Sequence, residues 1–247
     1  MKIQINKLTP TLAKFTLSDT QISFANSLRR ILLSEIPTLS IDLVEIKKNC
    51  TVLPDEMIAH RLGLIPFNSN TNLLYKEDCD CLTSCTKCAI NGSIKVSNEG
   101  NDVVTVTSRD IKFVDDTGMN DYFLTLRNPV VIVKLSNGHS LEANLVVRKG
   151  IAQTHSKYSP VTVVGFSYDE NNRLRHTDYW YEDDKNKEWP GLNEEEAIIG
   201  ECNIVNMEFE TVEGVLEAKT VLIKGLEILK NKVDDLLSAV EKYEHIN

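Results

Sequence analysis

The chain has 247 residues, of which 42% are hydrophobic, and a formal net charge of −9. This length suits one large domain or two modest ones. The acidic balance argues against bulk, sequence-independent binding of nucleic acid, which requires a surplus of Lys and Arg. Residues 1–6 lack the apolar run of a signal peptide, and no stretch approaches the roughly 20 apolar residues of a membrane span. We therefore expect a soluble, intracellular protein. In that compartment thiols stay reduced, so clustered cysteines indicate metal ligands in preference to disulfides.

The N-terminal segment combines a hairpin pattern with an amphipathic helix. Apolar residues alternate with polar ones over residues 3–17, which predicts a β-hairpin, and a helical period follows over residues 23–35. Four apolar residues share roughly one face of this helix: Phe24, Leu28, Ile31 and Leu32. The opposite side carries Asn26, Arg29 and Arg30. Core packing explains the apolar face, but it does not call for two adjacent arginines, so the helix is a candidate docking element.

The middle of the chain contains mainly strand patterns. Strands are expected at residues 39–46, 93–96, 103–107, 129–135, 141–147 and 161–168. The second and third of these are expected to form a hairpin with each other, and Asn137-Gly138 predicts a tight turn. A short helix is predicted at residues 53–63, which Pro54 opens. Residues 169–196 are predicted to be a long, partner-facing loop, and residues 202–210 another strand.

The longest predicted element is a helix from about residue 215 to residue 243, roughly 43 Å long at 1.5 Å per residue. Its apolar residues are spaced alternately by four and three positions, which forms a heptad seam. The seam consists of Leu222, Leu226, Leu229, Val233, Leu236 and Val240. Such a helix is too long to be buried by a small domain alone. We therefore expect the seam to face another chain.

The strongest local signal is a group of four cysteines within ten residues, Cys79, Cys81, Cys85 and Cys88. Four thiolates can form a tetrahedral shell around one Zn²⁺, and a shell of four protein ligands makes the zinc structural. The flanking residues are polar and cannot fold this loop by burial, whereas metal binding can. An iron–sulfur cluster is the main alternative metal centre. A redox pair of Cys85 and Cys88 leaves the other two thiols unexplained.

Motifs for catalysis are missing from the sequence. It contains no H-E-x-x-H, G-x-S-x-G, Walker or G-x-G-x-x-G pattern. An aromatic cluster in a polar setting spans residues 176–182 and includes Tyr179 and Trp180. It either pins its loop onto its own domain or anchors an interface, where Tyr and Trp are enriched. Both interpretations remain open.

Several motifs in a fixed order resemble the α-like assembly subunits of multisubunit RNA polymerases. They are residues 24–42, residues 55–66, the four-cysteine loop, residues 149–160 and residues 176–182. The cysteine loop and the last motif are similar to the polymerase II members of this family. The resemblance covers nearly the whole chain.

The resemblance implies an α+β fold with two domains. A discontinuous dimerisation domain, with antiparallel strands packed against two helices, would comprise residues 1–38 and 165–247. A mainly-β domain inserted at residues 39–164 would carry the zinc loop at residues 79–88. Members of the family are non-catalytic scaffolds, so the resemblance implies a chain that is not itself catalytic. Its similarity to the polymerase II members implies one structural Zn²⁺ in the cysteine loop and a place in the nucleus.

The resemblance also implies partners. The chain would form a heterodimer with a small α-like subunit, through Phe24, Leu28, Ile31, Leu32 and the heptad seam. The heterodimer would dock the second-largest catalytic subunit and two small zinc-binding subunits, with little or no direct contact to nucleic acid. Four residues are expected to serve in docking: Arg29, Arg30, Tyr179 and Trp180. The alternatives are an α-like subunit of another nuclear or archaeal-type polymerase, a free-standing zinc adaptor, and a zinc- or thiol-dependent enzyme that uses residues 79–88.

Overall fold

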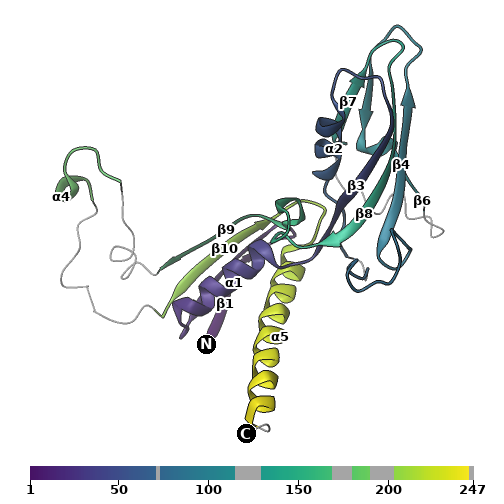
Figure 1. Ribbon diagram of the computed structural model, residues 1–247. Coiled ribbons are helices and arrows are strands. Elements are labelled where there is room, and N and C mark those ends of the chain that lie inside the picture. The colour runs from purple at the N-terminus through teal and green to yellow at the C-terminus, as the bar shows by residue number, and fades with distance from the viewer. Residues whose placement is uncertain (71–72, 115–128, 169–179, 190–202, 245–247) are drawn as a thin grey trace. The chain divides into compact units, whose positions relative to one another are not determined.

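A computed structural model describes residues 1–70, 73–114, 129–168, 180–189 and 203–244 (Figure 1). Its elements are β1 (Lys2–Leu8), β2 (Leu12–Ser18), α1 (Ile22–Ser34), β3 (Thr38–Asn49), α2 (Asp55–Gly63), β4 (Ala89–Ser97), β5 (Val104–Thr107), η1 (Ser108–Asp110), β6 (Ile111–Val114), β7 (Val131–Leu135), β8 (Ser140–Gly150), η3 (Ser156–Tyr158), β9 (Val161–Tyr168), α4 (Lys185–Glu188), β10 (Val205–Thr211) and α5 (Ala218–Glu244). These helices and antiparallel strands confirm the predicted α+β class.

The chain divides into two compact units. One comprises Met1–Leu33, Val161–Thr211 and Ala218–Asn247, and the other comprises Ser34–Pro160 and Val212–Glu217. The predicted domain ranges do not include the return of Val212–Glu217 to the second unit after β10. The role of residues 1–38 and 165–247 as a dimerisation domain stays a prediction.

The first unit is built on an antiparallel sheet in the order β1-β2-β10-β9. The predicted β1–β2 hairpin is confirmed, with Ile5 opposite Phe15. Alternate residues of β2 and β10 are buried, and Phe15 meets Phe209 edge to face at 6.4 Å between ring centroids. The buried face of α1 and the start of α5, which contacts β2 and β10, supply the remaining apolar side chains. This unit therefore has its own core on one face of the sheet.

The second unit contains a four-stranded antiparallel sheet in the order β3-β8-β4-β6 and a two-stranded sheet of β5 and β7. Helix α2, which Pro54 precedes as predicted, contributes Ile58 and Leu62 to the core of this unit. Phe67 and Phe113 lie in the same core, with their rings edge to face at 5.8 Å. The four-cysteine loop leads into β4, so this core supports it.

One predicted pairing is wrong. Residues 93–96 and 103–107 were expected to form a hairpin, but β4 pairs with β8 on one edge and β6 on the other. Because both edges of β4 are occupied, β5 pairs instead with β7. The predicted turn between β4 and β5 is present, since the Asn98 side chain donates to the carbonyls of Asp102 and Leu135. The turn at Asn137-Gly138 is confirmed, with Gly138 at φ +77°.

Candidate metal centre and partner-facing surfaces

The four cysteine sulfurs of residues 79–88 converge on one point. The Sγ–Sγ distances are 3.5 Å from Cys79 to Cys85, 3.4 Å from Cys81 to Cys88 and 3.7 Å from Cys85 to Cys88, and all four atoms lie within 4.8 Å of one another. A tetrahedron with Zn–S bonds of about 2.3 Å has edges of about 3.8 Å. The donor set therefore fits one metal ion, with no coordination position left open. A multi-iron cluster needs its thiolates arranged around a larger core, so the spacing favours a single ion.

The thiols of this loop differ in acidity. The backbone N–H of Lys87, followed by the Cys79 thiol, lowers the pKa of Cys85 to about 6. The hydrogen bond with Cys88, followed by burial, raises the pKa of Cys81 to about 11. Near neutral pH the metal-free loop therefore offers a ready thiolate at one position and a protonated thiol at another. A metal ion that binds all four sulfurs must displace protons.

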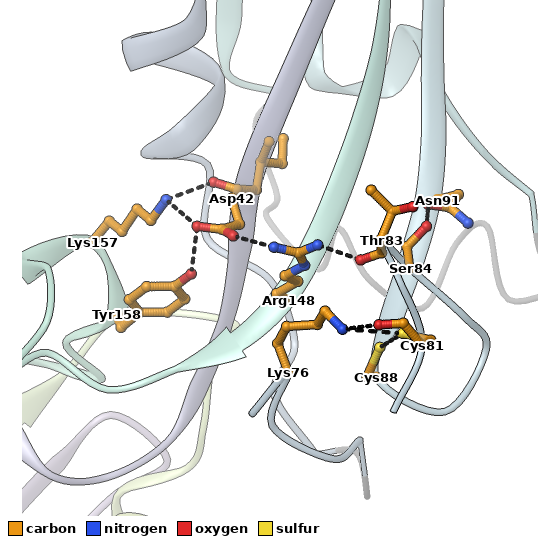
Figure 2. A network of polar contacts seen from close by, with 11 residues as sticks. Asp42, Lys76, Cys81, Thr83, Ser84, Cys88, Asn91, Arg148, Lys157 and Tyr158 are labelled. Atoms are coloured by element: carbon orange, nitrogen blue, oxygen red, sulfur yellow. Dashed lines mark hydrogen bonds and ion pairs between the residues drawn. The ribbon is translucent and has the colours of Figure 1, made fainter. Parts of the chain in front are cut away.

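A polar network connects the cysteine loop to the sheet behind it. Figure 2 shows Arg148 of β8 between Asp42 of β3 and Thr83 of the loop. Its Nη1 lies 3.0 Å from Asp42 Oδ2, and its Nη2 donates to the Thr83 carbonyl at 2.5 Å. Lys157 Nζ donates to the Ile41 carbonyl at 2.8 Å and lies 3.7 Å from Asp42 Oδ1. The sequence motif at residues 149–160 pointed to this region, but no local pattern identified Asp42 as its shared partner.

Tyr158 fixes the segment that follows β8. Its ring packs against Gly150 so closely that a Cβ on Gly150 would lie 2.6–2.8 Å from three ring carbons. Its carbonyl accepts a hydrogen bond from Thr38 Oγ1 at 2.6 Å, and its hydroxyl lies 3.5 Å from Asp42 Oδ1. Burial, followed by the nearby Asp42 carboxylate, raises the pKa of Tyr158. The phenol therefore stays protonated and is available as a donor to Asp42.

The helix α1 buries most of the side chains that the sequence assigned to a dimer interface. Leu28, Ile31 and Leu32 are at most 3% exposed within this chain, whereas Phe24 is half-buried. The first three therefore belong to the unit's own core. A periodic apolar face does not reveal whether its own domain or a partner covers it.

The two arginines of α1 lie away from this core. Arg29 is half-buried, and its Nε and Nη2 donate to Asn26 Oδ1 at 3.2 and 2.9 Å. Arg30 is exposed. The polar side predicted for this helix is therefore present, and Asn26 orients one of its two cations.

The helix α5 carries an apolar stripe that is largely exposed in the part of the chain that the structure describes. Leu222 and Leu229 are half-buried, while the other seam residues are exposed: Leu226, Val233, Leu236 and Val240. Ile223 and Leu237 are exposed beside them, which sequence analysis missed because it considered only a strict heptad. A period of 3.6 residues would have included them. No helix among the described residues is long and apolar enough to cross a membrane.

The aromatic cluster is only partly described. Tyr179 lies outside the described residues, and Trp180 is 82% exposed. This exposure disfavours Trp180 as the residue that pins the loop to its own domain. Nearby, Glu188 accepts hydrogen bonds from the backbone N–H groups of Asp184, Glu182 and Asp183, which lower the pKa of its carboxyl group. The local turn around α4 is thus ordered by backbone contacts and leaves the indole free of the core.

Comparison with known proteins agrees with this architecture. Residues 44–163 match the family model described as the RNA polymerase Rpb3/RpoA insert domain. The chain is 35% identical over 261 residues to DNA-directed RNA polymerase II subunit RPB3 of Schizosaccharomyces pombe, covering 97% of this chain and 87% of that protein.

Other relatives match over a shorter range. The chain is 38% identical over 183 residues to subunit 3 of the DNA-directed RNA polymerases II, IV and V of Arabidopsis thaliana, covering 68% of this chain and 57% of that protein. It is 35% identical over 170 residues to the DNA-directed RNA polymerase subunit Rpo3 of Methanosphaera stadtmanae, covering 68% of this chain and 61% of that protein. The chain therefore belongs to the Rpb3/RpoA family and is a homologue of RPB3, a subunit of RNA polymerase II that is not itself catalytic.

Proposed function

We propose that the chain is a nuclear assembly scaffold of RNA polymerase II, which serves the transcription of mRNA. It pairs with a small α-like subunit, and this heterodimer nucleates assembly with the second-largest catalytic subunit and the small zinc-binding subunits. The match to an RPB3 over 97% of the chain supports this function. The single observation that carries it is the uncovered apolar stripe on α5.

The stripe has the properties of a helix-pairing surface. Leu226, Val233, Leu236 and Val240 follow the alternate spacing of a coiled-coil seam, with Ile223 and Leu237 beside it. Exposed apolar side chains in one continuous row are unusual on a subunit that works alone, and they mark a surface that another protein covers. The partner that fits such a row is a second amphipathic helix from the small α-like subunit.

The helix α1 takes an indirect part in this pairing. Leu28, Ile31 and Leu32 hold α1 on its own sheet, so that half-buried Phe24 is the α1 residue offered to the partner. Arg29, Arg30, Tyr179 and Trp180 are proposed to dock the second-largest subunit. The exposed indole of Trp180 supports that role, because aromatic and Arg side chains anchor protein interfaces.

The metal proposed for the cysteine loop is one structural Zn²⁺. Cys79, Cys81, Cys85 and Cys88 would hold it, since thiolates at these separations match its preferred tetrahedral shell. When bound, zinc cross-links a loop that has little apolar material of its own. The chain's residues then present this loop as a fixed part of the second unit.

Co-expression with the small α-like subunit tests the pairing. The unaltered chain should form a 1:1 complex on size-exclusion chromatography with light scattering. Leu236→Asp should prevent pairing, because an unpaired carboxylate would be buried in an apolar seam. Asn231→Asp is the matched control, since it places the same side chain on the opposite face of α5, at an exposed position. A monomeric unaltered chain, or equal pairing by both variants, contradicts the proposal.

The remaining alternatives are separated by metal and complex analysis. An enzyme that uses residues 79–88 requires an open metal position or a reactive thiol in the metal-loaded chain. One zinc per chain with all four cysteines resistant to alkylation excludes it. Purification from nuclear extract then distinguishes polymerase II from another polymerase or a free-standing adaptor, through the catalytic subunits that accompany the chain.

A further inference from the structure

The tip of the cysteine loop lacks apolar anchoring. Leu82, between the second and third cysteines, is 100% exposed, and Thr83 beside it is exposed as well. Ser84 makes one surface hydrogen bond, from Oγ to Asn91 Oδ1 at 3.2 Å. Burial therefore cannot hold this part of the loop, and its position depends on polar contacts from outside.

Arg148 supplies such a contact from the sheet. Its register places it opposite Ala89 of β4, the residue that follows the last cysteine, so it lies beside the base of the loop. Its side chain is only 14% exposed. One arm of the guanidinium donates to the Thr83 carbonyl, and the other pairs with Asp42 (Figure 2). The rigid fork of an arginine can serve both partners at once, which fixes the distance from the loop to β3.

Lys76, which lies three residues before Cys79, supplies a second contact. Its Nζ donates to the carbonyl of Cys81 and lies 3.4 Å from Cys81 Sγ (Figure 2). It also donates to the carbonyl of Cys79 at 3.3 Å. Four thiolates around a divalent cation carry a net charge of −2. A half-buried ammonium beside one sulfur compensates part of this charge and orients the backbone of two ligands. Groups of this kind, which hold the ligands and do not touch the metal, commonly tune metal affinity.

We propose that Arg148 and Lys76 are positioning residues of the metal centre, and that Asp42 orients Arg148. The two cations hold the four-cysteine loop in its metal-binding arrangement and connect it to the β3–β8 pair. This inference rests on the zinc-binding part of the proposed function. It assigns a role to side chains that lie outside the cysteine motif.

Zinc release from the full 247-residue chain tests the proposal. The zinc-loaded chain is mixed with excess 4-(2-pyridylazo)resorcinol, and the absorbance of the zinc–dye complex gives the rate of loss. Arg148→Gln and Lys76→Gln should release zinc about 10–100-fold faster, the usual effect of removing a group that supports metal ligands. Asp42→Asn should act in the same direction. Lys95→Gln is the matched control, because Lys95 forms a 3.1 Å ion pair with Glu142 across β4 and β8, away from the loop.

A spectroscopic measurement separates positioning from general stability. With Co²⁺ in place of Zn²⁺, the ligand-field bands report the symmetry of the four-sulfur site. Arg148→Gln and Lys76→Gln should change these bands while the far-ultraviolet circular dichroism of the chain stays unaltered. Lys95→Gln should change neither.

The outcomes distinguish two failures. Absence of zinc from the unaltered chain overturns the zinc-binding function itself. One zinc in the unaltered chain, with release from folded Arg148→Gln and Lys76→Gln within about twofold of the control, overturns only the positioning role. If Arg148→Gln does not fold, Lys76→Gln decides, because Lys76 bonds within the loop.

Discussion

The exposed seam predicts that Leu236→Ala weakens pairing more than it weakens folding. Leu236 is 66% exposed in the chain alone. Burying a whole leucine side chain contributes about 1.5–3 kcal/mol, so roughly one third of this, about 0.5–1 kcal/mol, is present in the isolated chain. The remaining two thirds, about 1–2 kcal/mol, become available when a partner covers the side chain. The Kd of the heterodimer should therefore rise about 5–30-fold.

The comparison variant is Leu28→Ala on α1. Leu28 is 1% exposed without any partner, so its truncation should lower the free energy of unfolding of the isolated chain by about 2–5 kcal/mol. Urea unfolding of each isolated variant gives its stability, and titration calorimetry with the small α-like subunit gives Kd. The pairing role of Leu236 is refuted if Leu236→Ala destabilises the isolated chain as much as Leu28→Ala and leaves Kd unchanged. The seam would then pack against its own domain.

Three further predictions concern the second unit. Gly150→Ala should lower the free energy of unfolding by about 1–3 kcal/mol, because its Cβ would overlap the Tyr158 ring, whereas Gly165→Ala, with no atom within 4 Å of its Cβ, should change it by less than about 0.5 kcal/mol in urea unfolding. In the metal-free chain at about pH 7, iodoacetamide should alkylate Cys85 before Cys81, as followed by mass spectrometry. A pKa of about 6 makes Cys85 a thiolate, whereas a pKa of about 11 keeps Cys81 protonated. Alkylation in the reverse order would contradict this difference in acidity. Folding raises the pKa of Tyr158, so above about pH 10 the unfolded chain binds fewer protons than the folded chain. The free energy of unfolding should therefore fall as pH rises through about 10. Tyr158→Phe should remove this part of the fall in unfolding curves measured at alkaline pH.

The cysteine ligand set could be predicted from sequence because its members are close in the chain. Four thiols within ten residues constrain one another whatever the surrounding fold is. Arg148 and Asp42 are 106 positions apart and meet only because β3 and β8 are paired. The wrong hairpin has the same origin. The turn after β4 could be predicted from the local sequence, but the partner of β5 depends on strands far away in sequence that occupy both edges of β4.

The lengths of the elements explain why the sheet of the first unit leaves much of the α5 seam exposed, whatever angle the helix makes with that sheet. The helix has 27 residues and is about 40 Å long. Strands β2 and β10 have seven residues each, about 24 Å, and four strands at a spacing of about 4.8 Å are narrower still. Even along the diagonal of the sheet, about 31 Å, roughly a quarter of the helix must therefore extend beyond it. Val221, near its start, is fully buried, and every described residue from position 230 to position 242 is exposed. Apolar side chains on such an overhang lie beyond the reach of their own sheet, which makes the second half of α5 the part whose substitution should affect the proposed assembly before folding.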